Sequence, residues 1–359
     1  MNMKPYQKTL PEEKLYLNVL NLSFKNNFLK LPAFVSSCDS YKKAWERLIA
    51  AKKINYDPLK EWERLEKNNI NFITAKEKSY PSLLKEINNF PLGIYVKGEI
   101  QQENNFIAVV GTRKSSPYGE LVTEKIVKEL INYNFTIVSG LAYGIDAIAH
   151  KTALKSGGKT IAVLGSGLDR VLPEGNKNLA KEILLKKGGL ISEYPLETEP
   201  KKYYFPWRNR IISGLCRATL IIEAPEKSGA LITTRFALEQ NREIFAIPGS
   251  IFNPNSLGPN NLIKEGAKLV SGIEDILEEL NISFAKKENL EKNSDLEKQI
   301  NNPLEKQIYQ SLSPVEPLAI DKIVEKFNLK SNEVLACLTS LELKGATKDL
   351  GGGNYIKIN

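Results

Sequence analysis

Short apolar runs rich in valine and isoleucine alternate with helical stretches through the middle of the chain. The runs are FIAVVG (106–111), FTIVSG (135–140), KTIAVLG (159–165), GLISEY (189–194), ATLIIEA (218–224) and EIFAIPG (243–249). All but GLISEY end in glycine or alanine, as a buried strand does before a helix. Strands that are apolar on both faces indicate an α/β fold with a doubly wound parallel sheet, over about residues 86–285.

The two flanking regions have different patterns. Residues 1–85 contain the helical segments LYLNVLNL, YKKAWERLIAA and PLKEWERLEKN, with too few β-branched runs for a sheet, and predict a small helical domain. The polar composition of residues 286–303 predicts a linker. Residues 304–359 combine three helical segments with a glycine-turned hairpin, which indicates a winged helix-turn-helix domain.

Composition and charge narrow the class of protein. The 359 residues are 42% hydrophobic and 26% charged, with a net charge of +8, as in ordinary globular proteins. Most of the excess lies in residues 1–85, where it marks either a surface that binds nucleic acid or a solvated helical face. The balanced charge of residues 304–359 makes strong DNA binding there doubtful. No apolar stretch reaches the ~18 residues of a membrane span, and the chain begins without a signal peptide, so we expect a cytoplasmic protein.

Cysteine and histidine are too sparse for most metal chemistry. The three cysteines, Cys38, Cys216 and Cys337, form no C-x-x-C pair, and His150 is the single histidine of the sequence. A zinc hydrolase needs two imidazoles in H-E-x-x-H, so we expect no metal site. Asp146 and His150 lie four residues apart on one predicted helix face, which favours a buried pair.

Small residues gather at the predicted carboxyl ends of the strands, where open α/β sheets bind ligands. They are Gly111-Thr112-Arg113, Ser139-Gly140-Leu141-Ala142-Tyr143-Gly144, Gly165-Ser166-Gly167 and Pro248-Gly249-Ser250. Small residues let a phosphate approach the backbone, and an arginine can grip its oxygens. We therefore predict an anion site on this rim. The alternative is that these glycines only accommodate tight turns.

Two further groups are candidate phosphate contacts. FPWRNRIISGL places Arg208 and Arg210 around Asn209 at the start of a helical stretch, and Asn176 and Lys177 open another. The alternative for the arginines is a structural role, as ion-pair partners of Glu193 or Glu223 at neighbouring strand ends. The alternative for Lys177 is a solvated helix start.

Nucleotide cofactors and catalysis have weaker support. The first turn lacks G-x-G-x-x-G, no acid ends the second strand, and Gly158-Lys159-Thr160 precedes a strand instead of following one. These departures disfavour NAD and exclude a P-loop ATPase, so we expect no cofactor. The carboxylates Glu193, Glu223 and Asp146 form no recognisable catalytic pair. The simpler interpretation is a binding protein rather than an enzyme.

Seven segments in order carry a family resemblance. VVGTRKSSPYG, VSGLAYGIDAIAH, TIAVLGSGLD, LISEYP, FPWRNRIISGL, SGALITTRFALEQ and AIPGS together resemble the DNA-processing protein A (DprA, also called Smf) family over about residues 80–280. The resemblance implies an extended Rossmann-like domain that binds single-stranded DNA without sequence preference and forms homodimers. It also implies a role in loading the RecA recombinase during natural transformation, and it implies no enzymatic activity.

The resemblance also implies which residues contact DNA. The family's G-S/T-R motif falls on Gly111, Thr112 and Arg113, and its later basic contact falls on Lys177. Ser139 and Gly140 belong to the same rim, while Arg208, Asn209 and Arg210 match the R-N-R motif, whose role is either DNA contact or structure. Tyr118 and Tyr143 are candidates for base stacking, with packing as the simpler use.

Two other functions stay open. Related Rossmann-like enzymes hydrolyse nucleotide monophosphates, but their P-G-G-x-G-T-x-x-E signature is replaced here by Pro248-Gly249-Ser250-Ile251-Phe252. The other alternative is a scaffold whose winged helix recruits protein while the central domain binds little. Loss of DNA binding in Arg113→Ala would separate the DNA-binding function from this scaffold.

Overall fold

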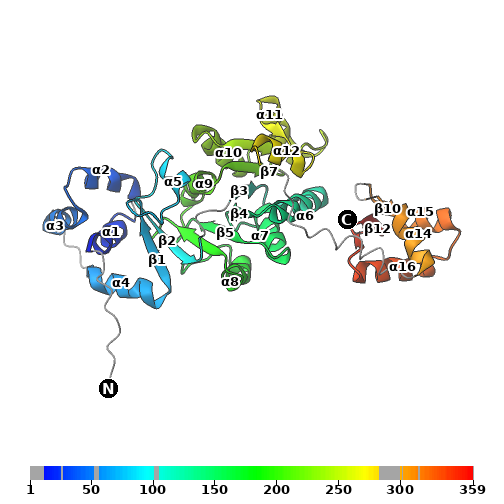
Figure 1. The fold of residues 1–359 in the computed structure, drawn as a ribbon, viewed down its shortest axis with the longest axis horizontal. Helices are drawn as coiled ribbons and strands as arrows, with labels where there is room; N and C mark the ends of the chain where they lie inside the picture. Colours follow the sequence, from blue (N-terminus) through cyan, green and yellow to red (C-terminus); the bar gives the residue numbers. More distant parts are fainter. Residues whose placement is uncertain are drawn as a thin grey trace, which may run out of the picture. The chain divides into compact units, whose positions relative to one another are not determined.

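The computed structural model describes residues 12–25, 27–51, 56–100, 105–282, 300, 302–313 and 316–358. The chain forms two compact units that divide after residue 284 (Figure 1). Of the predicted linker 286–303, only Ile300, Asn302 and Pro303 lie within the described residues. The two units are described separately below.

A parallel sheet forms the centre of the first unit, and all six predicted strands are confirmed. Its strands are β3 (Asn105–Val110), β4 (Phe135–Ser139), β5 (Thr160–Leu164), β6 (Gly189–Ser192), β7 (Ala218–Ile221), β8 (Glu243–Ala246) and β9 (Lys268–Leu269). They lie in the order β6-β5-β4-β3-β7-β8-β9. The chain therefore runs outward from β3 in one direction, then crosses back beside β3 and continues in the other.

Helices cover both faces of this sheet, which explains why its strands are apolar throughout. From Ser82 onward, the helices of this unit are α5 (Ser82–Lys85), α6 (Pro117–Asn132), α7 (Ile145–Lys155), α8 (Lys177–Leu185), α9 (Tyr204–Gly214), α10 (Ala230–Glu239), α11 (Leu257–Lys264) and α12 (Ile273–Glu279). Alternate residues of β3 enter separate cores: Ile107 packs with α6 and α7, and Ala108 packs with α9. Figure 1 shows α7 and α8 on one side of the sheet and α9 and α10 on the other.

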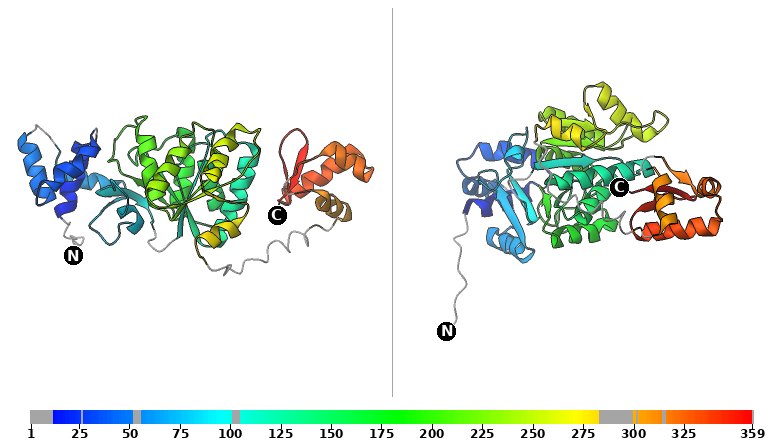
Figure 2. Two further views of the ribbon diagram at one scale, coloured as in Figure 1. Left: turned by 90° about the horizontal axis from the view of Figure 1, so that it is seen from above. Right: turned by 45° about the vertical axis from the view of Figure 1, so that its right-hand side comes forward.

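Two antiparallel strands extend the sheet beyond β6. They are β1 (Ile70–Thr74) and β2 (Gly93–Gly98), and β2 pairs with both β1 and β6. The expectation that residues 1–85 contain no strand is therefore wrong. In β1 the burial alternates, with Ile70 and Phe72 inside and Asn71 exposed, because one face of the strand receives the N-terminal helices. Figure 2 shows β1 and β2 between these helices and the parallel strands.

The N-terminal helices pack on this extension of the sheet. They are α1 (Glu12–Ser23), α2 (Leu31–Ser36), α3 (Tyr41–Ala51) and α4 (Pro58–Lys67). Leu17 of α1, Trp45 of α3 and Leu65 of α4 join one core with Phe72 and Tyr95 of the two strands. The three predicted helical segments are confirmed as α1, α3 and α4, whereas α2, with Pro32 in its first turn, was not predicted. Residues 12–85 lie in the same compact unit as residues 86–282. The boundary at residue 85 stays a prediction about domain organisation.

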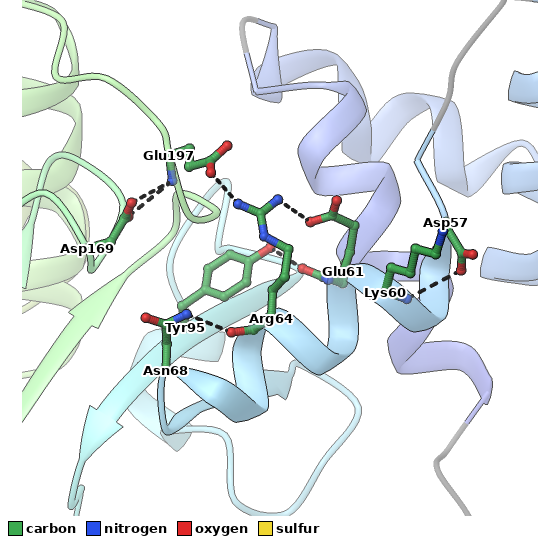
Figure 3. A network of polar contacts seen from close by, with 9 residues as sticks. Asp57, Lys60, Glu61, Arg64, Asn68, Tyr95, Asp169 and Glu197 are labelled. Atoms are coloured by element: carbon green, nitrogen blue, oxygen red, sulfur yellow. Dashed lines mark hydrogen bonds and ion pairs between the residues drawn. The ribbon is translucent and has the colours of Figure 1, made fainter.

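A polar network also ties α4 to the parallel sheet. Arg64 of α4 donates to Glu61 at 2.9 Å and contacts Glu197, which lies after β6 (Figure 3). The Glu197 backbone N–H in turn donates to both Asp169 carboxylate oxygens at 3.1 Å. Tyr95 Oη donates to Asn18 Oδ1 of α1 at 2.8 Å, inside the core. These contacts fix the N-terminal helices to the sheet.

The second unit is the predicted winged helix. Its elements are α14 (Pro303–Ser311), β10 (Leu318–Ala319), α15 (Ile320–Phe327), α16 (Ser331–Leu343), β11 (Thr347–Asp349) and β12 (Asn354–Lys357). The strands pair in the order β10-β12-β11, and Ile308, Ile323 and Leu338 bring the three helices into one core. The exposed face of α16 presents acidic, apolar and uncharged polar side chains, among them Glu333, Leu335 and Thr339, with no lysine or arginine.

Across the residues that the structure describes, no helix is both long and apolar enough to cross a membrane. The same residues contain no group of three or more histidine, cysteine, aspartate or glutamate side chains able to hold a metal ion.

Candidate nucleic-acid interface

The loop after β3 lies where the strand order reverses, between β3 and β7. Thr112 N donates to Glu223 O at 2.7 Å, and Ile145 N at the start of α7 donates to Thr112 O at 3.2 Å. Gly144 has a φ of +71°, and a Cβ atom there would lie 2.3 Å from Thr112 O. Glycine is therefore required at this position. Residues 111–113 are held between the end of β7 and the start of α7.

Arg113 is the member of the G-T-R motif that reaches solvent. Its side chain is exposed and has no hydrogen-bond or ion-pair partner among the described residues. Thr112 is buried instead, and its Oγ1 accepts from Lys114 N at 3.2 Å, which shapes the turn. The Lys114 side chain is also exposed and has no such partner in the described part of the chain. Lys114 was missed in the sequence, although it directly follows the motif.

Glu223 joins two loops of the rim through hydrogen bonds to its side chain. Its carboxylate is buried, and it accepts hydrogen bonds from Ser116 N at 2.9 Å, Ser116 Oγ at 2.5 Å and Asn253 Nδ2 at 3.2 Å. Ser116 is the N-cap of α6, so a negative charge already occupies the N-terminus of that helix. A Cβ atom at Gly119 would lie 2.3 Å from Glu223 Oε2, which confirms how tightly the carboxylate is packed.

Gly140, Asp146 and Arg208 form an interior network at the ends of β4 and β5. Arg208 is only 6% exposed, and its Nη1 donates to Gly140 O at 2.8 Å and to Val163 O. Burial lowers the pKa of Arg208 to about 10, while the neighbouring Asp146 raises it. Asp146 Oδ2 accepts from Gly140 N at 3.1 Å, and burial raises the pKa of this carboxyl. Arg208 thus fastens two strand ends together.

The other predicted residues of this region also have internal partners. Ser139 is fully buried, and its Oγ donates to Val109 O at 2.7 Å. Asn209 Nδ2 donates to Gly229 O at 3.3 Å. Arg210 Nη2 donates to both carboxylate oxygens of Glu193 at 2.5 and 2.6 Å, in a buried ion pair. Arg210 therefore has the alternative role given above, as an ion-pair partner of Glu193. Fewer of the predicted site residues therefore reach solvent here than the sequence predicts.

Lys177 lies farther along the same rim as Arg113. Asn176 is buried and donates to Leu141 O at 2.9 Å, which holds the loop that leads into α7. A Cβ atom at Gly175 would lie 3.0 Å from Tyr143 Oη, so the turn before α8 packs against this loop. Lys177 Nζ pairs with Glu174 at 2.9 Å, and both side chains are about half exposed or more. Such an exposed pair is weak, at about 0–1 kcal/mol, and leaves the lysine accessible to an anion.

His150 and Asp146 are both buried, but the predicted pair is not formed among the described residues. His150 Nδ1 lies 2.6 Å from Thr160 Oγ1, and that hydroxyl donates to Ile137 O at 2.8 Å. The imidazole therefore donates from Nδ1. Asp146 Oδ2 instead accepts hydrogen bonds from Gly140 N and Ala142 N, in the loop before α7. Burial lowers the pKa of His150 to about 3, and the charge of Arg208 acts in the same direction.

This depressed pKa makes stability depend on pH. Between pH 6.5 and 3 the unfolded chain binds a proton at His150 that the folded chain does not. The free energy of unfolding therefore falls as pH falls through this range. From pH 6.5 to 5, wild type should lose about 1.5 kcal/mol relative to His150→Asn, whose amide keeps a donor for Thr160. Urea titrations of both proteins at a series of pH values measure the difference. Parallel pH dependences would contradict the buried neutral imidazole.

Comparison with known proteins identifies the family. The model of DNA recombination-mediator protein A matches residues 71–281, more than half of the chain. The chain belongs to this family. A second model, the DprA winged helix domain, matches residues 293–353. The resemblance stated from the motifs is thereby confirmed, as is the combination of a Rossmann-like sheet with a winged helix.

Individual members of the DprA/Smf family are similar over long stretches. Protein Smf of Escherichia coli K12 is 40% identical over 298 residues, covering 82% of this chain and 79% of the relative. The DNA processing protein DprA of Streptococcus pneumoniae R6 is 46% identical over 201 residues, covering 56% of this chain and 71% of the relative.

Two solved structures of the family superpose on the fold. DNA processing protein A from Streptococcus pneumoniae has a TM-score of 0.60 and 38% identity, covering 74% of this chain and 93% of that one. DNA processing protein A from Helicobacter pylori, whose structure was reported for its single-stranded DNA binding mode, has a TM-score of 0.53 and 29% identity. It covers 58% of this chain and 95% of that one.

Proposed function

We propose that this protein binds single-stranded DNA on the rim that carries Arg113, Lys114 and Lys177. One observation carries the proposal: Arg113 and Lys114 extend into solvent without partners in the described part of the chain, from a loop that is itself fixed by hydrogen bonds. Because the loop backbone is already ordered, only the side chains lose freedom when they bind phosphate, and the planar guanidinium of arginine grips phosphate oxygens bidentately. The family member from Helicobacter pylori, which binds single-stranded DNA, supports the choice of ligand.

The family relationship extends the proposal to recombination. We propose that the protein protects incoming single strands in the cytoplasm during natural transformation and helps to load RecA on them. A homodimer would place two rims on one strand, and the second rim would then bind at a high effective concentration. The winged helix, whose charges balance, is assigned no DNA contact in this proposal.

Binding accounts for the site better than nucleotide hydrolysis does. A hydrolase needs a carboxylate that is free to act on substrate, but Glu223 is saturated by donors from Ser116 and Asn253. Glu223 also fills the N-terminus of α6, where a nucleotide phosphate would otherwise bind. We therefore propose a DNA-binding protein without enzymatic activity.

Fluorescence anisotropy with labelled oligo-dT and a matched duplex tests the function. We expect the single strand to bind more tightly, with an affinity that falls steeply in salt. Three phosphate contacts per protomer, at ~0.7 each, give a logarithmic salt slope of about −2. Equal competition by duplex, or no binding at all, would contradict the proposal and make a nucleotide-hydrolysis screen the next experiment.

A further inference from the structure

Two large apolar side chains project into solvent beside the cationic rim. Ile251 is 78% exposed and Phe252 is 90% exposed, in the loop that follows β8. A phenylalanine gains stability by burying its ring, so a ring left almost fully in water contributes little to the fold. These two residues, here called the apolar tip, therefore contribute little to the packing of the described fold.

The loop that carries the apolar tip is held in place. Phe252 N donates to Ser250 Oγ at 3.3 Å, and Asn253 N donates to Ser250 O at 3.0 Å. On the side before the tip, Tyr118 Oη donates to Pro248 O at 2.7 Å. The exposure of Phe252 is therefore a consequence of an internally bonded turn.

The same loop is bonded directly to the cationic loop. Asn255 Nδ2 donates to Lys114 O at 3.1 Å, and Asn253 Nδ2 donates to Glu223 Oε1 at 3.2 Å. Three residues of extended chain span at most about 11 Å, so the Phe252 backbone lies within that distance of Asn255. Phe252 thus projects from the neighbourhood of Arg113 and Lys114, within reach of a nucleotide whose phosphate they hold.

Resting on the proposed function, we propose that Phe252, flanked by Ile251, is a base-stacking residue of this site. One or two bases pack on the apolar tip while Arg113 and Lys114 hold adjacent phosphates. Every base has a π-face, so this contact needs no particular sequence. In a duplex the bases are already stacked and paired, and they cannot reach the ring. Phe252 therefore contributes to the preference for single strands.

Tyr118 and Tyr143, the platforms considered from sequence, are less suited to this role. Tyr118 is 43% exposed, and its hydroxyl is bonded to the loop before the tip. Tyr143 packs against the turn at Gly175. Both rings brace loops of the rim, whereas the Phe252 ring is open to a base.

The test compares oligo-dT with an abasic strand of the same length and charge. Phe252→Ala should weaken binding of oligo-dT about tenfold, as expected for the loss of base stacking on one ring. Its affinity for the abasic strand and its salt slope should equal those of wild type, because the lost contact involves neither phosphate nor charge. Phe252→Trp should keep the oligo-dT affinity. Leu185→Ala, which removes an apolar side chain that is 82% exposed at the end of α8, serves as the matched control.

The outcomes separate this proposal from the proposed function. Unchanged oligo-dT affinity in Phe252→Ala, together with a loss in Arg113→Ala, would overturn stacking alone and leave the apolar tip to a protein partner. An equal loss on the abasic strand would show that Phe252 shapes the loop instead of contacting bases, which also overturns stacking. A wild-type protein that fails to bind oligo-dT would overturn both proposals.

Discussion

Arg113→Ala is expected to weaken binding of single-stranded DNA by tenfold or more, without unfolding the protein. The side chain has no partner among the described residues, so its removal leaves no buried group unsatisfied. A charge-assisted contact with phosphate contributes about 1.5–3 kcal/mol, which corresponds to roughly 10- to 150-fold in affinity. The logarithmic salt slope should become shallower by ~0.7 for the lost phosphate contact. Anisotropy titrations of oligo-dT at several salt concentrations measure both quantities.

Lys155→Ala is the matched control for this experiment. Lys155 is exposed at the C-terminus of α7, the helix whose N-terminus lies against the Arg113 loop. The substitution therefore removes one positive charge, as Arg113→Ala does, but from the opposite edge of the sheet. Its effect should stay within about twofold, the size of a screened, distant charge. Equal losses in both variants would mean that net charge, and not the rim, determines binding. Unchanged affinity in Arg113→Ala would reject the site.

The sequence predicts the parallel sheet well because burial on both faces leaves a local signal. Each of the strands from β3 to β8 carries a mainly apolar run, with a glycine or another small residue at its end or within three residues after it. The strand β1 was missed because its segment INFIT is short, contains two polar residues and follows three predicted helical segments. Its strand conformation depends on pairing with β2, and that pairing is a tertiary contact that no local pattern reports.

For the site, sequence predicts the place but not which side chains reach solvent. The glycine-rich ends indicate the rim, and the structure does bring loop 111–113 against the start of α7, and Asn176 against the loop that leads into α7. Arg113, Arg208 and Arg210 are indistinguishable as residue types, yet only Arg113 is exposed. The difference arises because α9 turns both of its arginines toward strand ends, where backbone carbonyls and Glu193 accept their donors.

Sequence spacing also fails to predict the partners of Asp146 and His150. Spacing of four residues places two side chains on one helix face, which predicted a pair. Spacing does not report what the neighbouring strands offer. Thr160 of β5 gives His150 a hydroxyl, and the loop after β4 gives Asp146 two backbone donors, and these partners replace the pair.

Glu193→Ala is expected to lower the free energy of unfolding by about 3–5 kcal/mol, because it leaves a buried arginine charge without its counterion. The Arg210 side chain is 3% exposed, and its Nε and Nη1 atoms have no hydrogen-bond partner among the residues that the structure describes. Glu193 is thus the acceptor that the structure gives this guanidinium, which otherwise lies over the Trp207 ring at 4.6 Å. Urea unfolding, extrapolated to water, measures the loss.

Two further variants separate the buried pair from a DNA contact. Glu199→Ala breaks the exposed pair with Arg170, whose atoms lie 3.7 Å apart, and should cost at most about 1 kcal/mol. Replacing both Glu193 and Arg210 by leucine and methionine should recover most of the stability, since no buried charge then remains. Neither change should alter the oligo-dT affinity of folded protein beyond about twofold, because the pair is not exposed on the rim. A selective loss of DNA binding in the stable double variant would instead return Arg210 to the contact surface.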